Sequence, residues 1–374
     1  MNKKIVIIGA GNSGRGFIAR LFKADGAEIC FLDKDRDLVK KLAKEKCFSV
    51  FAGEKQTEYV IDGYQAYAAD SDEGLDAAEG ADYIIVCVGN QNLTELAPFF
   101  ERLSERKPAD QCKVIVCENG ISPKEILRNA VKGTKAEGML ITQGVIFCTS
   151  IPKRKGELDI ISEEYDELPI DYDEELFRWG STHFQFIKQF DLLMERKLYT
   201  YNCLSACIAY LGYLKNYTDY GAAARDPDIY NFCGRLRGSL DEAVCKLTGV
   251  SKKEQEEFSE KAIKKFTSPV IADTIEKNGR VVTRKIGPDE RLIGPVKLFL
   301  RYRIDTDSLC RVIAAALYYM EKEESLEYGG TIYGNVIALL RAVNPWMESE
   351  PGLVRMVENY FSKIKEGEKE LWNI

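Results

Sequence analysis

The segment Glu195–Ser205 carries side chains that could do acid–base chemistry. Its pattern predicts a helix, in which Asn202 and Ser205 lie about 140° and about 80° around the axis from Lys197. All three side chains can therefore border one cleft, and a lysine whose pKa is lowered by burial can act as a general base. The chain contains one histidine, His183, so the base must be sought among other residue types. We predict Lys197 as this base; a surface lysine on an amphipathic helix is the plain alternative.

A glycine-rich turn near the N-terminus has the spacing of a dinucleotide-binding loop, G-x-G-x-x-G. It follows an apolar run and opens a helical pattern, so its glycines permit a tight turn and close approach of a pyrophosphate. The N–H groups of the helix N-terminus can then hold the anion. The residues expected to contact the cofactor here are Gly9, Gly11, Asn12, Ser13 and Gly14. A glycine turn in a sheet protein that binds no nucleotide is the alternative.

Asp33, Gly89 and Asn90 extend this predicted cofactor site. Asp33 closes the second expected strand, about 20 residues after the glycine turn. Its carboxylate can accept hydrogen bonds from an adenosine ribose and would repel a 2′-phosphate, which favours NAD over NADP. Gly89 and Asn90 follow the third strand and are expected to line the same crevice. Hydride transfer to or from a carbinol would then need a proton acceptor and donors for the oxyanion.

The first half of the chain alternates buried apolar runs with helical patterns. Strands are expected at 3–8, 29–32, 83–88, 114–117 and 144–148, with helices after the glycine turn and at 36–46. Such β-branched runs between helices predict a parallel, doubly wound sheet. The acidic segment 157–175 is expected to be a solvated strand-and-turn excursion with one buried face.

From about Lys188 long helical patterns dominate the chain. They cover residues 188–216, 234–248, 251–266, 289–303, 306–322 and 333–342. We therefore predict an α/β Rossmann-type N-terminal domain, residues 1–187, followed by a mostly α-helical C-terminal domain, residues 188–374.

The composition excludes several classes of protein. The 374 residues are 45% hydrophobic and 30% charged, which is ordinary for a globular protein. A net charge of -7 without a long basic run argues against nucleic-acid and anionic-membrane partners. No apolar stretch is long enough to cross a bilayer. Eleven cysteines without a Cys-x-x-Cys pair or a signal segment predict reduced thiols in the cytoplasm. One histidine nearly excludes a His-rich zinc site, so no metal is expected, and the oligomeric state is left open.

Four motifs, in order along the chain, resemble those of the polyol-specific long-chain dehydrogenase family. They are Gly9–Ile18, Cys117–Asn119, Glu195–Asn202 with Ala209–Gly212, and Val281–Ile286 with Asp289–Pro295. The total length favours the short mannitol-1-phosphate type over longer polyol dehydrogenases. The resemblance implies a metal-independent, NAD-linked oxidoreductase that interconverts a sugar phosphate and a polyol phosphate, of the fructose 6-phosphate and mannitol 1-phosphate type.

The resemblance also implies a role for each matching residue. Lys197 would be the general base, and Asn119 and Asn202 would form the oxyanion site. The expected ligands of the substrate's phosphate or hydroxyls are three basic residues of the downstream motif: Arg284, Lys285 and Arg291. Charges on a helix surface are the alternative for these three.

Two positions depart from the family pattern and keep other functions open. The family has histidine eight residues after its lysine, where this chain has Ser205, a shorter donor that cannot carry positive charge. An acidic position after the fifth strand looks here like Lys153. The alternatives are a lysine-dependent NAD dehydrogenase of a hexuronate or other hydroxy acid, and an NAD-binding homologue with reduced or lost catalysis. We expect a functioning but slower enzyme, in which Ser205→His raises kcat if the pocket has room.

Overall fold

The N-terminal part of the chain is built on a sheet of eight strands. They are β1 (Lys4–Ile8), β2 (Glu28–Asp33), β5 (Gln65–Ala68), β6 (Tyr83–Val86), β7 (Lys113–Cys117), β8 (Leu140–Gly144), β11 (Leu168–Asp171) and β12 (Phe184–Ile187). Their order is β12-β11-β8-β7-β6-β1-β2-β5, and every neighbouring pair is parallel except β11 with β8. Because β1 lies between β2 and β6, the winding of the sheet reverses beside β1. The expected Rossmann-type fold is confirmed.

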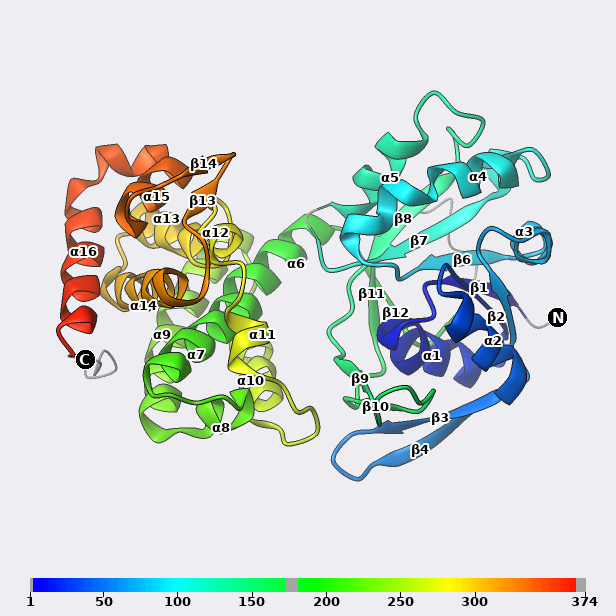
Figure 1. The fold of residues 1–374 in the computed structure, drawn as a ribbon, viewed down its shortest axis with the longest axis horizontal. Helices are drawn as coiled ribbons and strands as arrows, with labels where there is room; N and C mark the ends of the chain where they lie inside the picture. The colour runs from blue at the N-terminus through cyan, green and yellow to red at the C-terminus, as the bar shows by residue number, and fades with distance from the viewer. Residues whose placement is uncertain (1–2, 121, 173–180, 368–374) are drawn as a thin grey trace. The chain divides into compact units, whose positions relative to one another are not determined.

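The computed structural model describes residues 3–120, 122–172 and 181–367 (Figure 1). The chain divides into two compact units, residues 1–194 and 195–374. The boundary expected from the sequence, after residue 187, lies a few residues before this division.

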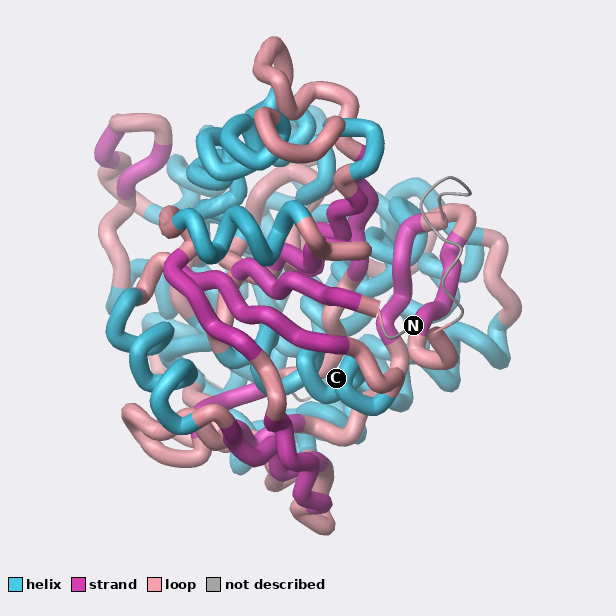
Figure 2. Tube along the Cα trace, turned by 90° about the vertical axis from the view of Figure 1, so that its right-hand side faces the viewer, coloured by secondary structure: helices cyan, strands magenta, loops and turns pink. Residues whose placement is uncertain are grey.

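Helices cover both faces of the sheet (Figure 2). Alternate residues of each strand pack into two separate cores. Ile5 and Ile7 pack on the side of α1 (Ala19–Ala24) and α2 (Arg36–Glu45). Val6 and Ile8 pack on the opposite side, whose helices are α3 (Asp72–Glu79), α4 (Ala97–Ser104) and α5 (Pro123–Val131). Burial on both faces explains why these strands read as continuous apolar runs.

A second sheet of four strands was not predicted. It has the order β4-β3-β10-β9 and consists of β3 (Cys47–Ala52), β4 (Thr57–Asp62), β9 (Ser150–Pro152) and β10 (Ile160–Ser162). Strand β4 is mostly exposed and buries only Ile61, so its short run of Tyr59, Val60 and Ile61 gives a weak apolar signal.

Two sequence expectations in this unit were wrong in part. The fifth strand is β8 at 140–144, whereas residues 145–148 are buried without strand pairing. Within the acidic segment, β11 is an interior strand whose Leu168 and Ile170 are fully buried, so this part is no solvated excursion. Positions 173–175 of that segment lie outside the described residues.

The C-terminal unit is mostly helical, as expected. Its helices are α7 (Cys203–Leu214), α8 (Tyr220–Arg225), α9 (Pro227–Thr248), α10 (Lys252–Thr267), α11 (Ile275–Gly279), α12 (Val282–Lys285), α13 (Ile293–Tyr302), α14 (Asp307–Glu323), α15 (Val336–Val343) and α16 (Pro351–Lys365). A short hairpin, β13 (Glu327–Tyr328) and β14 (Thr331–Ile332), follows α14. The helices α8, α11, α12 and α16 were not predicted. In the parts of the chain that the structure describes, no helix is both long and apolar enough to cross a membrane.

Candidate active site

The glycine turn joins β1 to a π turn, Gly14–Ile18, which leads into α1. Gly9 has a φ of +100°, and a Cβ there would stand 2.3 Å from the carbonyl oxygen of Cys87. A Cβ on Gly14 would stand 2.1 Å from the carbonyl oxygen of Gly9. Around Gly11, by contrast, none of the described residues comes within 4 Å of the Cβ position. The backbone therefore requires glycine at positions 9 and 14, whereas the space beside Gly11 is open to a ligand.

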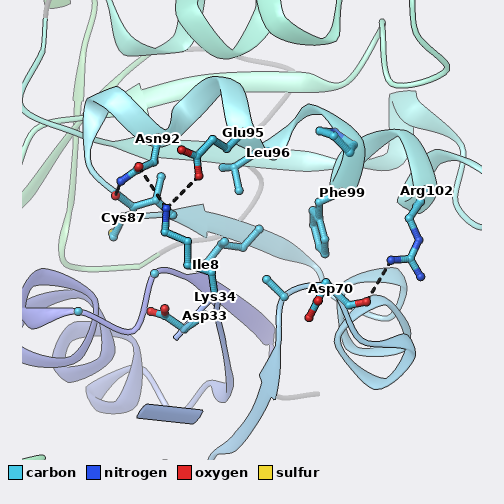
Figure 3. A pocket seen from close by; sticks show the side chains of 15 residues that line it. Ile8, Asp33, Lys34, Asp70, Cys87, Asn92, Glu95, Leu96, Phe99 and Arg102 are labelled. Carbon is cyan, nitrogen blue, oxygen red and sulfur yellow. Dashed lines mark hydrogen bonds and ion pairs between the residues drawn. The ribbon is translucent and has the colours of Figure 1, made fainter. Parts of the chain in front are cut away.

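A cavity of about 410 Å³ lies at the carboxyl ends of β1, β2, β5 and β6 (Figure 3). Of the predicted cofactor residues, Gly9, Gly11 and Asp33 line it. One carboxylate oxygen of Asp33 accepts a hydrogen bond from the Ala10 N–H at 2.7 Å, which ties the glycine turn to β2. Doubly wound sheets bind ligands in the crevice outside the carboxyl ends of their strands, where the winding reverses. The other predicted cofactor residues do not line the cavity, although each lies within a few positions of a lining residue in the sequence. They are Asn12, Ser13, Gly14, Gly89 and Asn90.

Next to Asp33, the cationic side chain of Lys34 is already engaged (Figure 3). Its Nζ lies 2.9 Å from a carboxylate oxygen of Glu95 and 3.3 Å from Oδ1 of Asn92. The Lys34 ammonium is therefore paired, while Asp70, Glu95 and Arg102 also line the cavity.

The loops after β6 and β7 are joined by a buried carboxylate that the sequence analysis did not single out. Oε1 of Glu118 accepts a hydrogen bond from the Gly89 N–H at 2.7 Å. Burial raises the pKa of Glu118 to about 7. Beside it, Oδ1 of Asn90 is buried and has no hydrogen-bond partner among the described residues. Asn119, the residue after Glu118, is exposed. These loops thus offer an unsatisfied acceptor and an exposed amide.

Lys197 ends α6 (Phe190–Lys197) and is only 9% exposed. Burial, followed by the positive charges of Lys265 and Arg291, lowers its pKa to about 7. A substantial fraction of the side chain is therefore a neutral amine near neutral pH, which is the form that accepts a proton. The alternative of a surface lysine is wrong at this position.

A π turn, Leu198–Asn202, separates Lys197 from α7. The angles expected between the site residues assumed an unbroken α-helix, which was wrong, because a π turn takes more residues per turn. Its consecutive side chains at 199–201 are all buried, against α10 among other elements. Asn202 and Ser205 nevertheless stay partly exposed where α7 begins. Single π turns recur at functional sites.

The three predicted substrate ligands lie on and after α12. Lys285 is 3% exposed, donates a hydrogen bond to the carbonyl oxygen of Asn278, and has its pKa lowered to about 7 by burial, Arg291 and Arg284. The charge of Arg291 thus acts on both Lys285 and Lys197. Arg284 itself is exposed. The C-terminal unit therefore brings the predicted base and the predicted basic ligands into one electropositive group.

Val281 precedes this basic group in a strained conformation. Its φ of +60° is left-handed, which is an outlier for a β-branched residue. The carboxylate of Glu324 accepts hydrogen bonds from the N–H groups of Val281 and Val282, the latter at 3.0 Å. Glu324 is the residue that follows α14. Its hydrogen bonds to these two N–H groups hold the first turn of α12, the helix that carries Lys285. No pattern in the sequence pointed to Glu324.

Ser205 and Lys153, the two departures from the family pattern, have definite partners. The Tyr220 hydroxyl donates a hydrogen bond to the Ser205 hydroxyl oxygen at 3.1 Å. The Lys153 ammonium lies 3.5 Å from the centre of the Phe51 ring, in the second sheet of the N-terminal unit.

The histidine of the chain, His183, has its Nδ1 2.8 Å from the Asp166 carbonyl oxygen. Within residues 3–120, 122–172 and 181–367, no group of three His, Cys, Asp or Glu side chains is placed to hold a metal ion.

Two family models match consecutive parts of the chain. The mannitol dehydrogenase Rossmann domain matches residues 3–170, and the mannitol dehydrogenase C-terminal domain matches residues 189–364.

Relatives and solved structures of similar architecture cover nearly the whole chain. The mannitol-1-phosphate 5-dehydrogenase of Arthrobacter sp. is 31% identical, over 86% of this chain and 88% of the relative. That of Caldanaerobacter subterraneus is 28% identical, over 97% and 98%. A D-sorbitol dehydrogenase structure superposes with a TM-score of 0.77 at 14% identity, over 100% and 95% of the two chains. The Pseudomonas fluorescens mannitol 2-dehydrogenase, a complex with NAD and D-mannitol, gives 0.70 at 15%, over 99% and 94%. The chain belongs to the mannitol dehydrogenase family.

Proposed function

We propose that this protein is an NAD-dependent oxidoreductase that interconverts a polyol phosphate and a ketose phosphate, with mannitol 1-phosphate and fructose 6-phosphate as the first pair to test. The observation that carries the proposal is the buried Lys197, whose pKa of about 7 suits a general base, in one electropositive group with Arg291 and Lys285. Relatives at 28–31% identity carry the name of this activity.

NAD, when bound, supplies the hydride acceptor, and the cavity beside Asp33 and Gly11 has the place and lining for its adenosine end. The open space beside Gly11 suits its pyrophosphate, and the unsatisfied Oδ1 of Asn90 suits an amide donor. In the oxidation direction, the neutral Nζ of Lys197 takes the proton of the reacting hydroxyl. In the reduction direction, the protonated Nζ returns it to the oxyanion, which the amide of Asn202 stabilises.

The basic ligands explain why a phosphorylated substrate is proposed. Arg291 lies in the turn before α13 and is partly exposed. Its guanidinium therefore has donors left for a phosphate beyond the weak contact with Glu290 at 3.4 Å. Lys285 already donates to a carbonyl oxygen, and Arg284 is exposed. We assign Arg291 the main phosphate contact, with Lys285 and Arg284 supporting it.

The test is a screen of NADH oxidation with fructose 6-phosphate, fructose, a hexuronate and 2-dehydropantoate side by side. We expect kcat/KM to be highest for fructose 6-phosphate. A preference for a carboxylate substrate would replace this proposal by the hydroxy-acid alternative, and NADH binding without turnover would favour a homologue with lost catalysis. Lys153, which motivated the carboxylate alternative, lies on the Phe51 ring, and its neighbour Arg154 pairs with Glu157 at 3.4 Å.

Cofactor choice gives a separate prediction. Asp33→Ala should raise kcat/KM with NADPH relative to NADH, because the variant removes the charge that repels a 2′-phosphate. Asp37→Ala, an exposed carboxylate of α2, is the matched control and should leave the ratio unchanged. The two cofactors are compared at fixed fructose 6-phosphate. Tighter binding of NADPH than of NADH by the wild-type protein would refute the ribose argument.

We further propose that the protein works in the cytoplasm on small molecules, without a nucleic-acid or membrane partner. The net charge of -7 and eleven cysteines, all of them free, support this.

A further inference from the structure

Ser205 stands where the family pattern has an imidazole, and its hydroxyl is held by a tyrosine. Tyr220, the first residue of α8, is 6% exposed. Its hydroxyl lies 3.1 Å from the Ser205 Oγ and 3.5 Å from the Ser205 carbonyl oxygen. Ser205 itself stays partly exposed at the start of a helix whose neighbouring side chains, Cys203, Leu204 and Ala206, are buried.

The Tyr220 ring is fixed by several contacts. The Tyr220 N–H donates to the Asp273 carbonyl oxygen at 3.0 Å, and its ring packs edge-on against Phe266, with the centres 6.1 Å apart. Helix α8 also approaches α7 closely, because a Cβ on Gly212 would stand 2.8 Å from Cβ of Ala223. The hydroxyl therefore has a defined target in Ser205.

The direction of this hydrogen bond decides where the Ser205 proton goes. A serine hydroxyl has one proton to donate and can accept two hydrogen bonds. Burial holds the pKa of Tyr220 well above its ordinary value, so the phenol stays protonated. The hydrogen-bond geometry has the Tyr220 hydroxyl as donor to the Ser205 Oγ at 3.1 Å. The proton of Ser205 is then left to donate elsewhere, and its partly exposed side offers that direction.

The pair also lies near the proposed base. Phe266, which packs on Tyr220, packs on Tyr201 of the π turn as well, with ring centres 6.2 Å apart. The adjacent residue, Lys265, is one of the two charges that act on Lys197. The end of α10 thus touches both the Ser205–Tyr220 pair and the surroundings of Lys197.

We propose that Tyr220 is a positioning residue that orients the Ser205 hydroxyl as a neutral hydrogen-bond donor to the reacting oxygen of the substrate. This assignment rests on the proposed dehydrogenase function. The Ser205–Tyr220 pair takes the place of an imidazole. A histidine at position 205 and the Tyr220 hydroxyl exclude each other, since the ring would meet that hydroxyl.

A double-mutant cycle tests the assignment. The full-length wild type, Ser205→Ala, Tyr220→Phe and the double variant are compared in steady-state reduction of fructose 6-phosphate by NADH. We expect Tyr220→Phe to lower kcat about tenfold with little change in KM for NADH, as for one lost hydrogen bond. In the Ser205→Ala background, the same change should have no further effect on kcat, because Tyr220 acts through Ser205. Ser205→Thr, which keeps the hydroxyl, should retain more activity than Ser205→Ala.

Tyr213→Phe is the matched control, because it removes a tyrosine hydroxyl from α7, the helix that carries Ser205. This hydroxyl donates to a carboxylate oxygen of Glu323 at 2.5 Å. It should leave kcat unchanged. An equal loss of kcat on adding Tyr220→Phe to the wild type and to Ser205→Ala would overturn the assignment, since Tyr220 would then act independently of Ser205. A wild type that turns over no ketose phosphate would overturn the proposed function, and this assignment with it.

Ser205→His gives an independent outcome. The sequence alone favoured a gain in kcat from this change, provided the pocket has room. With the Tyr220 hydroxyl 3.1 Å from the Ser205 Oγ, we now expect a loss. If the Ser205→His enzyme were faster than the wild type, a histidine ring at position 205 would be compatible with Tyr220, and this part of the proposal would be wrong.

Discussion

Replacing Lys197 by methionine is expected to lower kcat by about 10²–10⁴-fold, which is the usual contribution of a general base. Methionine keeps the volume of this buried side chain and removes only the proton acceptor. NADH binding should remain nearly intact, because the cofactor cavity belongs to the N-terminal unit and Lys197 to the C-terminal one. The measurement is steady-state kinetics together with NADH titration of each protein.

The control for this change is Lys246→Met, which alters an exposed lysine of α9 that pairs with Glu242. It should leave kcat unchanged. A Lys197→Met enzyme with most of its activity would remove Lys197 from the mechanism. In the wild type, polyol oxidation should gain rate as pH rises through about 7, because the neutral amine is the active form.

The same lysine should make stability depend on pH. Its pKa in the folded protein, about 7, lies below the ordinary value of 10.5, so the unfolded chain binds more protons between these values. This contribution to the free energy of unfolding therefore increases as pH rises from about 7 towards 10.5. Lys197→Met removes the cost of burying the charge, so we expect its Tm to exceed that of the wild type by more at pH 7 than at pH 10.

Replacing Arg291 by alanine is expected to raise KM for fructose 6-phosphate by about 10–100-fold, as for a lost hydrogen bond between charged groups. KM for unphosphorylated fructose should change far less, because no phosphate is there to be bound. Loss of the Arg291 charge should also raise the pKa of Lys197, since that charge helps to lower it. The rate profile of oxidation would then shift to higher pH.

The matched control for Arg291 is Arg301→Ala, an exposed arginine of α13 that stacks on Tyr302. It should alter neither KM. Equal increases of KM for fructose and for fructose 6-phosphate in Arg291→Ala would show that Arg291 binds hydroxyls rather than the phosphate.

The sequence predicted the elements whose burial is uniform and missed those that depend on tertiary pairing. Strands β1 and β6 are buried on both faces, so their apolar runs were readable. The run Val145–Cys148 is equally apolar and buried but is not a strand, although the Val145 N–H donates to the carbonyl oxygen of Pro169 in β11. Strand β8, by contrast, contains Thr142 and Gln143. Gln143 is fully buried and lies 3.3 Å from Asp171, so a hydrogen bond compensates its polarity. Apolar content measures burial, and it does not report ladder pairing.

The candidate site was predictable where its residues follow a motif and unpredictable where partners come from distant parts of the chain. The motif pointed to Lys197, whereas its low exposure is seen only in the structure, since the sequence left a surface lysine as the alternative. Tyr220 and Glu324 act through contacts with Ser205 and Val281 that no local pattern encodes. Glu118 lay within a quoted motif, yet its bond to Gly89 depends on the pairing of β6 with β7.

The π turn between Lys197 and Ser205 sets the angle between these two side chains around the helix axis. A π turn takes about one residue more per turn than an α-helix, so relaxing 198–202 into a regular α-helix of unchanged length would rotate the lysine by about 100° relative to the serine. The protein should therefore be sensitive to substitutions that favour a regular α-helix in this stretch. For anyone who grafts this segment into another helical scaffold, the π turn must be kept together with the number of residues between the two side chains.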